Sequence, residues 1–510
     1  MSYTEPEPSS RQTGERRRLF LEAGEQFASS YKRAQSYLGL SLLLANEFDD
    51  VSPNTSPRLE AVDSPTIDVH LAGELQPNHG YDHISSFTFP HNEESRLLED
   101  EASVKTQISA YGSSTVPHTI FNSVNTLMGV GMLSLPFAFK LSGWIVSSVL
   151  LVVIAFTTSF TAKILGRILK KHPNLKSYGD IARLYGGSSI EAIVTLFFSL
   201  DLMGAMISMI ILFSNSFNIF FPSLSVIVFK CLIVSIVFVL SFLPLSVLSL
   251  FSLLGIVCTS SILIIVIVCG LLTTAGPGSL LSPVTTRLFP TEYKNVFLSF
   301  GIFLSPWGGH PVFPEFYRDM VHPSRFEICC NVTFFTAFDL DFFLSFAGYL
   351  MFGDDCQDSI TSNLMTNKGY PKLISPLICV FMGLLPISKL PLIAKPLITV
   401  YESYFGLSES LVEYGKRKEI FGFKRIVSRI IFCTFIFIIS VIFTSFGQVV
   451  SLLGSAICFT ICLTLPLLFY SSIFEDELTS YQKFFFRTGA AISFICSLIG
   501  TYGSIFIDPV

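Results

Sequence analysis

A series of long apolar runs is the feature that most limits how this 510-residue chain can fold. A helix of about 20 apolar residues crosses the ~30 Å hydrocarbon core of a bilayer. Eleven such runs lie near 118–139, 144–166, 189–214, 225–243, 247–273, 294–314, 327–352, 373–394, 426–446, 449–471 and 486–507. Lipid cannot satisfy exposed backbone groups, so each run is expected to be helical. We therefore predict an all-α polytopic membrane protein with eleven transmembrane helices.

The segment 1–116 differs sharply in composition from the rest of the chain. It carries 18 acidic against 9 basic residues, is rich in Ser, Glu and Pro, and contains no long apolar run. Such a composition is typical of disorder, so we predict a disordered cytosolic tail over 1–116 and a transmembrane domain over 117–510. Glu93, Leu97 and Leu98 match the spacing of an acidic dileucine signal that adaptor proteins read, although a chance match is the alternative.

Charged loops predict how the chain is oriented in the membrane. The loop after the second run is basic, with Arg167, Lys170, Lys171, Lys176 and Arg183. The loop after the eighth run is also basic, with Lys416, Arg417, Lys418, Lys424 and Arg425. Basic loops remain on the cytoplasmic side. Alternation across eleven spans then places the N-terminus in the cytosol and the C-terminus in a lumen or outside.

Two of the apolar runs are interrupted in the middle. The first run contains Gly129, Gly131 and Pro136, and the sixth contains Pro306, Gly308, Gly309, Pro311 and Pro314. Backbone that leaves the helix inside a bilayer must line a cavity or bind a ligand. Interrupted helices at corresponding positions of two halves indicate the binding site of a secondary transporter. A structural kink without binding is the alternative.

The spacing of the two interrupted runs predicts an internal repeat. Five spans precede the sixth, and five is odd, so the second set of five must run inverted relative to the first. We therefore predict a leucine-transporter-like inverted repeat of five plus five helices with one extra C-terminal helix. In such repeats the substrate site lies near the bilayer midplane.

The first interruption has the chemistry of an anion site. Gly129 and Gly131 can present backbone N–H groups without obstruction by a Cβ atom. A helix that restarts there offers its N-terminal end to a carboxylate. The neighbouring polar residues Asn125, Thr126 and Ser134 can orient that group.

The second interruption supplies the opposite chemistry. Freed carbonyl groups around Ser305, Trp307 and Gly308 can accept hydrogen bonds from an ammonium group. Opposed anion and ammonium subsites select a zwitterion, which predicts an amino acid as substrate. Close helix packing through small residues is the alternative explanation of the glycines.

A few ionisable residues lie inside the runs, where a charge costs about 2.5–3.5 kcal/mol on insertion scales. Asp201 lies in the third run, Asp339 and Asp341 in the seventh, and Lys389 in the eighth. Asp201 or Asp339 can carry a proton, because burial raises the pKa of a carboxyl group in general. Either can instead be a static partner of Lys389. His310 can titrate near neutral pH, with a structural hydrogen-bonded role as the alternative.

Four stretches together resemble the amino acid/auxin permease family. They are Phe121–Trp144, Trp307–Met320, Gly348–Leu364 and Leu385–Leu397. Within the family the chain is most similar to the fungal vacuolar amino-acid transporters and the vesicular inhibitory amino-acid transporter. The resemblance implies a leucine-transporter-like fold and proton-coupled amino-acid transport across the membrane of an acidic organelle. It also implies that Lys389 faces the first interrupted helix, where it is a coupling candidate that can replace the bound sodium ion of sodium-coupled relatives of the fold with a fixed or protonatable charge.

These features together predict a proton-coupled transporter of neutral amino acids in the vacuolar or a related endomembrane, most simply an antiporter. One alternative is a proton symporter that exports amino acids from the lumen. Another is an amino-acid sensor or scaffold with little net transport. No cofactor, metal site, nucleic-acid partner or enzymatic activity is expected. Most cysteines lie inside apolar runs, where a thiol commonly packs as a small hydrophobe.

Overall fold

The computed structural model describes residues 114–243, 245–404 and 423–507, which all belong to one compact unit. The predicted tail therefore lies outside the described residues except for 114–116, as do Glu93, Leu97 and Leu98. The described chain begins with a bridge between Ser114 and Met320 and then enters its first helix.

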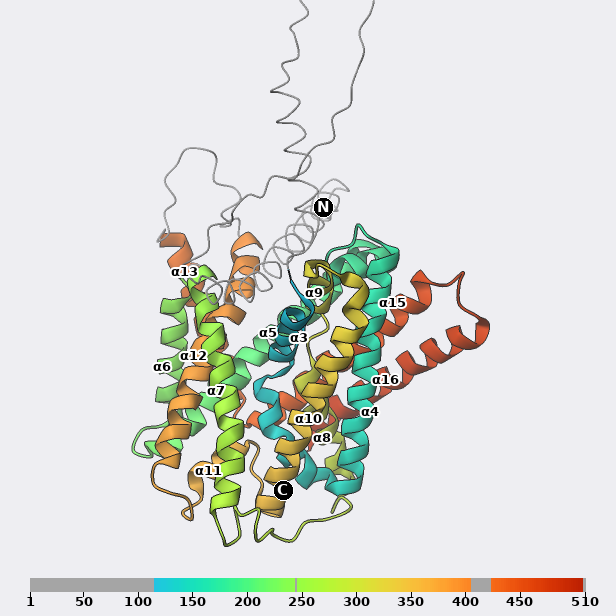
Figure 1. Ribbon diagram of the computed structural model, residues 1–510. Helices are drawn as coiled ribbons and strands as arrows, with labels where there is room; N and C mark the ends of the chain where they lie inside the picture. Colours follow the sequence, from blue (N-terminus) through green and yellow to red (C-terminus); the bar gives the residue numbers. More distant parts are fainter. Residues whose placement is uncertain (1–113, 244, 405–422, 508–510) are drawn as a thin grey trace, which may run out of the picture. The chain divides into compact units, whose positions relative to one another are not determined.

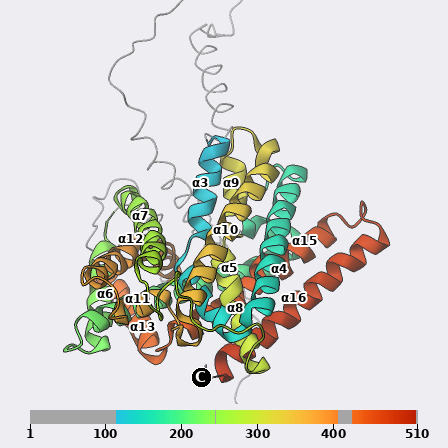
Figure 2. The ribbon, with the colours of Figure 1, turned by 60° about the horizontal axis from the view of Figure 1, so that its bottom comes forward.

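The described residues form helices joined by loops (Figure 1). In chain order these are α3 (Val116–Leu127), η1 (Val130–Ser134), α4 (Leu135–Lys171), α5 (Tyr178–Phe220), α6 (Val226–Leu240), α7 (Leu245–Leu272), α8 (Tyr293–Leu304), η2 (Ser305–Trp307), α9 (Phe313–Asp319), η3 (Pro323–Arg325), α10 (Phe326–Phe352), η4 (Gly353–Asp355), α11 (Ile360–Thr366), α12 (Ile374–Tyr404), α13 (Phe423–Ile442), α14 (Phe446–Leu452), the π-helix η6 (Leu453–Thr464), α15 (Leu465–Ile473) and α16 (Ser480–Phe506). Helices α3 and α9 lie side by side at one end of this unit (Figures 1 and 2).

Helix length and composition mark this protein as an all-helical polytopic membrane protein. Among the described residues, 8 helices are long and apolar enough to cross a bilayer. This number is lower than the eleven predicted, because three of the predicted spans are not separate, long helices. The first predicted span is divided between α3, η1 and the start of α4, which also contains the second span, the sixth is divided between α8 and α9, and α6 has only 15 residues. The number of eleven spans stays a prediction.

A single glycine separates the first predicted span from the second. Gly143 lies within α4 at φ 70° and ψ 171°, a conformation that residues with a Cβ atom rarely adopt. The helix is kinked there, and the N–H groups of Trp144 and Ile145 donate to Arg287 O and Leu288 O, both at 3.0 Å. A Cβ atom at Gly143 would lie 2.7 Å from the backbone carbon of Phe289. Both backbone conformation and space therefore require glycine at this kink.

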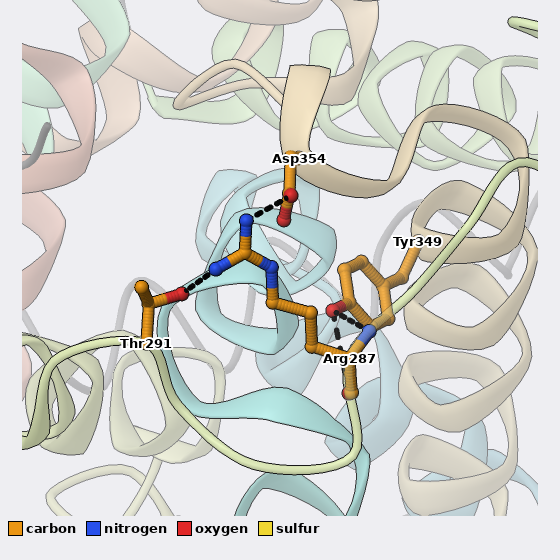
Figure 3. A network of polar contacts seen from close by, with 4 residues as sticks. All are labelled: Arg287, Thr291, Tyr349 and Asp354. Carbon is orange, nitrogen blue, oxygen red and sulfur yellow. Dashed lines mark hydrogen bonds and ion pairs between the residues drawn. The ribbon is translucent and has the colours of Figure 1, made fainter.

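The loop between α7 and α8 is held against the end of α10 by a small polar network (Figure 3). The Arg287 guanidinium donates to Asp354 Oδ2 at 2.7 Å and also to the Thr291 hydroxyl. The backbone N–H of Arg287 donates to the Tyr349 hydroxyl at 3.0 Å. The ion pair is about half exposed, so it is worth only ~0–1 kcal/mol. Its role is to fix the position of the loop.

Helix α8 packs very closely against the segment formed by α14 and η6. A Cβ atom at Gly301 would lie 1.8 Å from Ser451 O, and one at Gly454 would lie 1.8 Å from Gly301 O. Small residues allow helix backbones to approach in a membrane, where packing and hydrogen bonds replace the hydrophobic effect between helices. The Ser451 hydroxyl adds a hydrogen bond to Leu298 O at 2.5 Å. This seam holds the last turn of α8 against η6, directly before the second interruption.

Asp358 connects the loop after α10 to the start of α14. Its carboxylate accepts hydrogen bonds from the N–H groups of Phe446 at 2.9 Å and Gly447 at 3.3 Å. Its backbone carbonyl accepts one from the Ser134 hydroxyl at 2.6 Å. Burial raises the pKa of Asp358, although the N–H groups of Gly447 and Phe446 oppose that shift. One loop residue thus links the first interrupted segment to α14.

This linkage predicts a pH-dependent stability. The pKa of Asp358 is raised in the folded state. Its contribution to the free energy of unfolding is therefore fully present below about pH 4, the pKa of an aspartate in the unfolded chain. It is lost as pH rises through the folded pKa. Asp358→Asn keeps an acceptor oxygen and cannot ionise. We expect its melting temperature in detergent to exceed that of the wild type increasingly as pH rises, by about 2 °C or more.

Asp354→Asn is the matched control for this measurement. It removes an acidic side chain of the same loop at an exposed pair, where the expected change is within about 1 kcal/mol. Parallel melting curves for Asp358→Asn and the wild type from acidic to neutral pH would contradict the assignment.

Candidate functional site

The first predicted interruption is present in the structure. Helix α3 ends at Leu127, and the next two residues leave the helical conformation, Met128 at ψ 71° and Gly129 at ψ 178°. The chain then turns through η1 and enters α4. The first N–H groups of η1 have no carbonyl within their own helix to bond to, as at any helix start. The carbonyl of Met128 is likewise released from the ladder of α3. The N–H group of Gly129 itself donates to Leu127 O at 2.8 Å, so the groups on offer at this break are the first N–H groups of η1 and the Met128 carbonyl.

The second predicted interruption is also present. Helix α8 ends at Leu304, η2 adds one tight turn, and α9 begins at Phe313. Within the break, Gly309 N–H donates to Trp307 O at 2.9 Å and Val312 N–H donates to Gly309 O at 3.0 Å. The Trp307 side chain is fully buried and stacks on Phe334 of α10, with ring centroids 5.8 Å apart. The contribution of Trp307 to the site is therefore its backbone.

The two interruptions touch each other. A Cβ atom at Gly131 would lie 2.9 Å from Ser305 Oγ and 3.3 Å from the nitrogen of Pro306. A Cβ atom at Gly309 would lie 3.0 Å from Leu127 Cδ2. A side chain at either glycine would push the two segments apart. Gly131 and Gly309 therefore allow the two breaks, which are far apart in the sequence, to lie against each other. We call the two breaks in contact the constellation.

The polar side chains predicted at the first break differ in what they contact. The Thr126 hydroxyl donates to Asn122 O at 2.9 Å, within its own helix. The buried Ser134 hydroxyl donates to Asp358 O at 2.6 Å. Both groups hold backbone in place. The half-buried amide of Asn125 has no hydrogen-bond partner among the described residues and is the side chain of the three that is available to a ligand.

Lys389 of α12 faces the first break, as the resemblance implied. Its Nζ donates to Met128 O at 3.0 Å. That carbonyl lies at the C-terminal end of α3, where the partial negative charge of a helix favours a cation. The stem of Lys389 packs against α7, because a Cβ atom at Gly255 would lie 3.1 Å from Lys389 Cε. No ion pair joins Lys389 to an acidic side chain among the described residues.

His310 of the second break is fully buried and bonded to α4. Its Nε2 lies 2.9 Å from Thr161 Oγ1 and 3.1 Å from Thr158 O. Asp201 of α5 is half-buried and accepts from Cys458 Sγ at 4.0 Å, a weak contact. The same thiol faces Gly308, where a Cβ atom would lie 3.1 Å from Cys458 Sγ. Both Asp201 and His310 therefore lie close to the second break.

Asp339 is not brought to this constellation. It is exposed on the outer surface of α10, whereas Asp341 is buried. Residues two apart on a helix point about 200° away from each other. Only one of the pair can therefore face the interior, and the structure places Asp341 there. A role for Asp339 at the site, or as a partner of Lys389, has no support in this geometry.

Sequence reasoning missed one residue beside the second break, Cys458. It lies in η6, where its thiol faces Gly308 and reaches Asp201 Oδ1 at 4.0 Å. In the sequence it sits in an apolar run and looks like a packing residue. The one available signal was its four-residue spacing from Cys462, which puts two thiols on the same side of a helix. The π-helical geometry that surrounds it has no clear sequence signature, although π segments are frequent at functional sites.

The fold and its paired breaks define a class of helical membrane transporter. The chain belongs to the transmembrane amino acid transporter protein family, whose model matches residues 112–506. This confirms the family resemblance found in the sequence.

Among similar proteins, amino acid transporter AVT1H of Arabidopsis thaliana is 30% identical over 383 residues, which cover 74% of this chain and 85% of that protein. Amino acid transporter AVT1B of the same plant is 27% identical over 441 residues, or 80% of this chain and 78% of that protein. A mutant of the manganese transporter of Eremococcus coleocola has the same fold, with a TM-score of 0.51, 13% identity and coverage of 79% and 92%. The relatives are transporters, in agreement with the prediction that this chain is not an enzyme.

The contact between Lys389 and Met128 predicts a specific transport defect. Lys389→Met keeps most of the apolar stem but removes the cation from the C-terminal end of α3. Loss of a hydrogen bond to a charged group costs about 1.5–3 kcal/mol, so we expect amino-acid flux in proteoliposomes to fall at least about tenfold.

Lys140→Met is the matched control, since Lys140 also donates to a backbone carbonyl, that of Cys356 at 3.3 Å, but away from the break. Wild-type flux from Lys389→Met would show that the lysine has no part in transport.

Proposed function

We propose that this protein is a proton-coupled transporter that exchanges neutral amino acids for protons across the vacuolar or a related endomembrane. The observation that carries the proposal is the contact between the two breaks at Gly131 and Ser305. It brings amide groups and carbonyl groups, each released from a helix, to one place inside the membrane domain. Family membership supports amino acids as the substrates.

The chemistry of the constellation favours a zwitterion. The N–H group of Gly131 at the start of η1 is suited to a carboxylate, assisted by Asn125, whereas the N–H group of Gly129 already donates to Leu127 O at 2.8 Å. The carbonyl groups of Ser305, Trp307 and Gly308 are suited to an ammonium group. These backbone and amide groups carry only partial charges. They can therefore bind a substrate whose net charge is zero without a further counter-ion. A second charge on the substrate would be desolvated without a partner, which is costly.

Two ionisable residues beside the second break are the candidates for proton coupling. Asp201 lies against Cys458 of η6, and His310 lies within the second break and bonds to α4. Lys389 acts as a fixed cation at the end of α3, in place of a bound metal ion. A pH difference is worth about 1.4 kcal/mol per unit and per proton, so ~2 units sustain roughly a hundredfold gradient of a neutral substrate.

The proposed membrane topology follows the charge of the loops. We place the N-terminus in the cytosol and the C-terminus in the lumen, with eleven spans arranged as an inverted repeat of five plus five and one additional helix. Basic residues support this orientation at the end of α4, where Arg167 pairs with Glu327 at 2.9 Å and Lys171 with Glu477 at 2.8 Å. The two breaks occupy the first position of each repeat, as inverted symmetry requires.

Flux measurements in proteoliposomes test this function. The purified full chain would be offered a panel of labelled amino acids under pH gradients of either sign. Exchange predicts that neutral amino acids accumulate in vesicles with an acidic interior and that basic or acidic ones do so poorly. Accumulation with an acidic exterior would indicate symport. Binding without any gradient-dependent flux would indicate a sensor and would contradict the proposal.

A pair of glycine variants ties the flux to the constellation. Gly131→Ala forces apart the two breaks, since its Cβ atom would lie 2.9 Å from Ser305 Oγ. We expect it to lower flux at least about tenfold, as a misplaced binding group does. Gly489→Ala adds the same methyl group at ordinary contact distance, 3.4 Å from Leu467 Cδ1. Equal flux in the two variants would dissociate transport from the contact between the breaks.

A further inference from the structure

The interior face of α10 carries one acidic side chain, that of Asp341. It is only 5% exposed, and Ala337 and Leu344 are buried one turn away on either side of it. The backbone carbonyl of Asp341 accepts a hydrogen bond from the Ser345 hydroxyl, but its carboxyl group has no hydrogen bond and no ion pair within the described part of the chain. A buried charge without a partner is costly. This carboxyl group therefore needs a proton or another cation.

Two contacts of the same helix face show what Asp341 faces. Residues seven apart lie on one side of an α-helix, two turns or about 10 Å from each other. Seven residues before Asp341, Phe334 stacks on Trp307 of the second break, with ring centroids 5.8 Å apart. Seven residues after it, a Cβ atom at Gly348 would lie 2.5 Å from Cγ of Pro136, directly behind the first break. The helix η1 itself packs against α10. Asp341 therefore faces the constellation, between one contact to each break.

The helices around α10 do not supply a counter-ion. Figures 1 and 2 show α10 beside α3 and α4. On α4, Lys163 donates to Asn331 Oδ1 and Lys140 to Cys356 O, contacts near the two ends of α10. The other titratable side chains of the elements packed against α10 are His118 of α3, Cys258 and Cys269 of α7, Arg167, Lys170 and Lys171 of α4, Arg325 of η3, and Asp354 and Asp355 of η4.

The ionisable side chains of the constellation are bonded elsewhere. His310 bonds to α4, and Lys389 donates to Met128 O. Within the described part of the chain, none of the charged side chains around α10 forms an ion pair with Asp341. The positive charge that neutralises Asp341 therefore comes from a proton or from a ligand in the constellation.

We propose that the Asp341 carboxyl group is the place where a proton and the substrate ammonium compete. In the empty site the group holds a proton. An entering amino acid displaces that proton, which leaves to water on the side from which the substrate came, and its ammonium group then donates to the carboxylate. The loaded site holds two positive groups, the ammonium and Lys389, and two negative ones, Asp341 and the substrate carboxylate. Its charges therefore balance.

Competition at one carboxyl group produces exchange without a second coupling site. In an acidic lumen Asp341 takes up a proton and the amino acid is released, whereas at the higher pH of the cytosol the proton leaves and the amino acid binds. By linkage, each ligand weakens the binding of the other by the same factor. Asp201 and His310 differ from Asp341 because each already contacts another side chain. The inference rests on the proposed exchange of amino acids for protons and adds the residue at which it takes place.

Binding of a labelled neutral amino acid to the purified full chain tests the assignment. Asp341→Asn keeps the size of the side chain but can neither ionise nor release a proton. Asp339→Asn is the matched control, because it removes an exposed carboxylate two positions away on the same helix. Two quantities are measured for each protein: the affinity from acidic to slightly alkaline pH, and the protons released on binding, followed with an indicator dye in weak buffer.

Competition predicts that the affinity of the wild type and of Asp339→Asn falls towards acidic pH, by up to about tenfold per pH unit, and that each binding event releases about one proton. Asp341→Asn should release none, and its affinity should not change with pH. At neutral pH its affinity should be about tenfold or more below that of the wild type, because a hydrogen bond between charged groups is lost. At acidic pH the two affinities should converge.

Chemical labelling of the unaltered chain supplies a second measurement that needs no folded variant. A hydrophobic carbodiimide reacts with buried, protonated carboxyl groups, and mass spectrometry locates the modified residue. Asp341 should be labelled at acidic pH, and a saturating neutral amino acid should protect it at a pH where it binds. Labelling of Asp341 that the amino acid does not change would contradict the competition.

Three binding results would also overturn the assignment: proton release and pH dependence in Asp341→Asn equal to those of the wild type, the same defects in Asp339→Asn, or an affinity that needs sodium ions in the wild type but not in Asp341→Asn. The last result would assign a metal cation to the carboxylate. Failure of this assignment alone is distinguishable from failure of the proposed function. In the first case the wild type still accumulates neutral amino acids under a pH gradient, and in the second it does not.

Discussion

Hydrogen-bonding groups of the backbone that lipid cannot satisfy are the constraint on which this structure depends. Two membrane helices are broken, and each break releases N–H and C=O groups inside the apolar domain. Such backbone is tolerated only where protein or a water-filled cavity surrounds it. The protein meets this requirement by placing the breaks against each other at Gly131 and Ser305. The same arrangement brings polar backbone groups that are released from the helical ladder to one place, which makes it suitable for a polar ligand.

The surrounding helices hold the breaks in register from several sides. Lys389 bonds to the end of α3, and Thr161 and Thr158 hold His310. The close seam between Gly301 and Gly454 fixes the end of α8 against η6. These contacts come from α4, α8, α12 and η6, so movement of any of these helices changes the geometry of the breaks. A transporter needs such coupling between its substrate site and its helices, because access to the site must alternate between the two sides.

Much of this site could be predicted from the sequence because glycine and proline have direct effects on helix geometry. Runs containing Gly129, Gly131 and Pro306 cannot form uninterrupted helices, and the structure has breaks at these places. Family resemblance placed Lys389 opposite the first break. What could not be predicted depends on helix rotation and on helix type. Asp339 and Asp341 are equivalent in composition, and only the packing of α10 turns the second of them inward.

The thiols of η6 show the same limit more clearly. Cysteine inside an apolar run is usually a packing residue, and nothing in the local sequence indicates that the Cys458 thiol meets Asp201, 257 residues away in the chain. The number of spans was hard to define for a related reason. A span broken into α8 and α9, or kinked at Gly143, does not have the length that defines an ordinary membrane helix.

The central claim is that the two breaks together hold one amino acid. It is tested most directly by an electron cryo-microscopy map of the protein in a lipid nanodisc with a saturating neutral amino acid. The account predicts ligand density between the breaks, with the carboxylate at the N–H group of Gly131 and the ammonium at the carbonyls of Ser305 and Trp307. Density for the amino acid elsewhere, or contact with only one break, would contradict it.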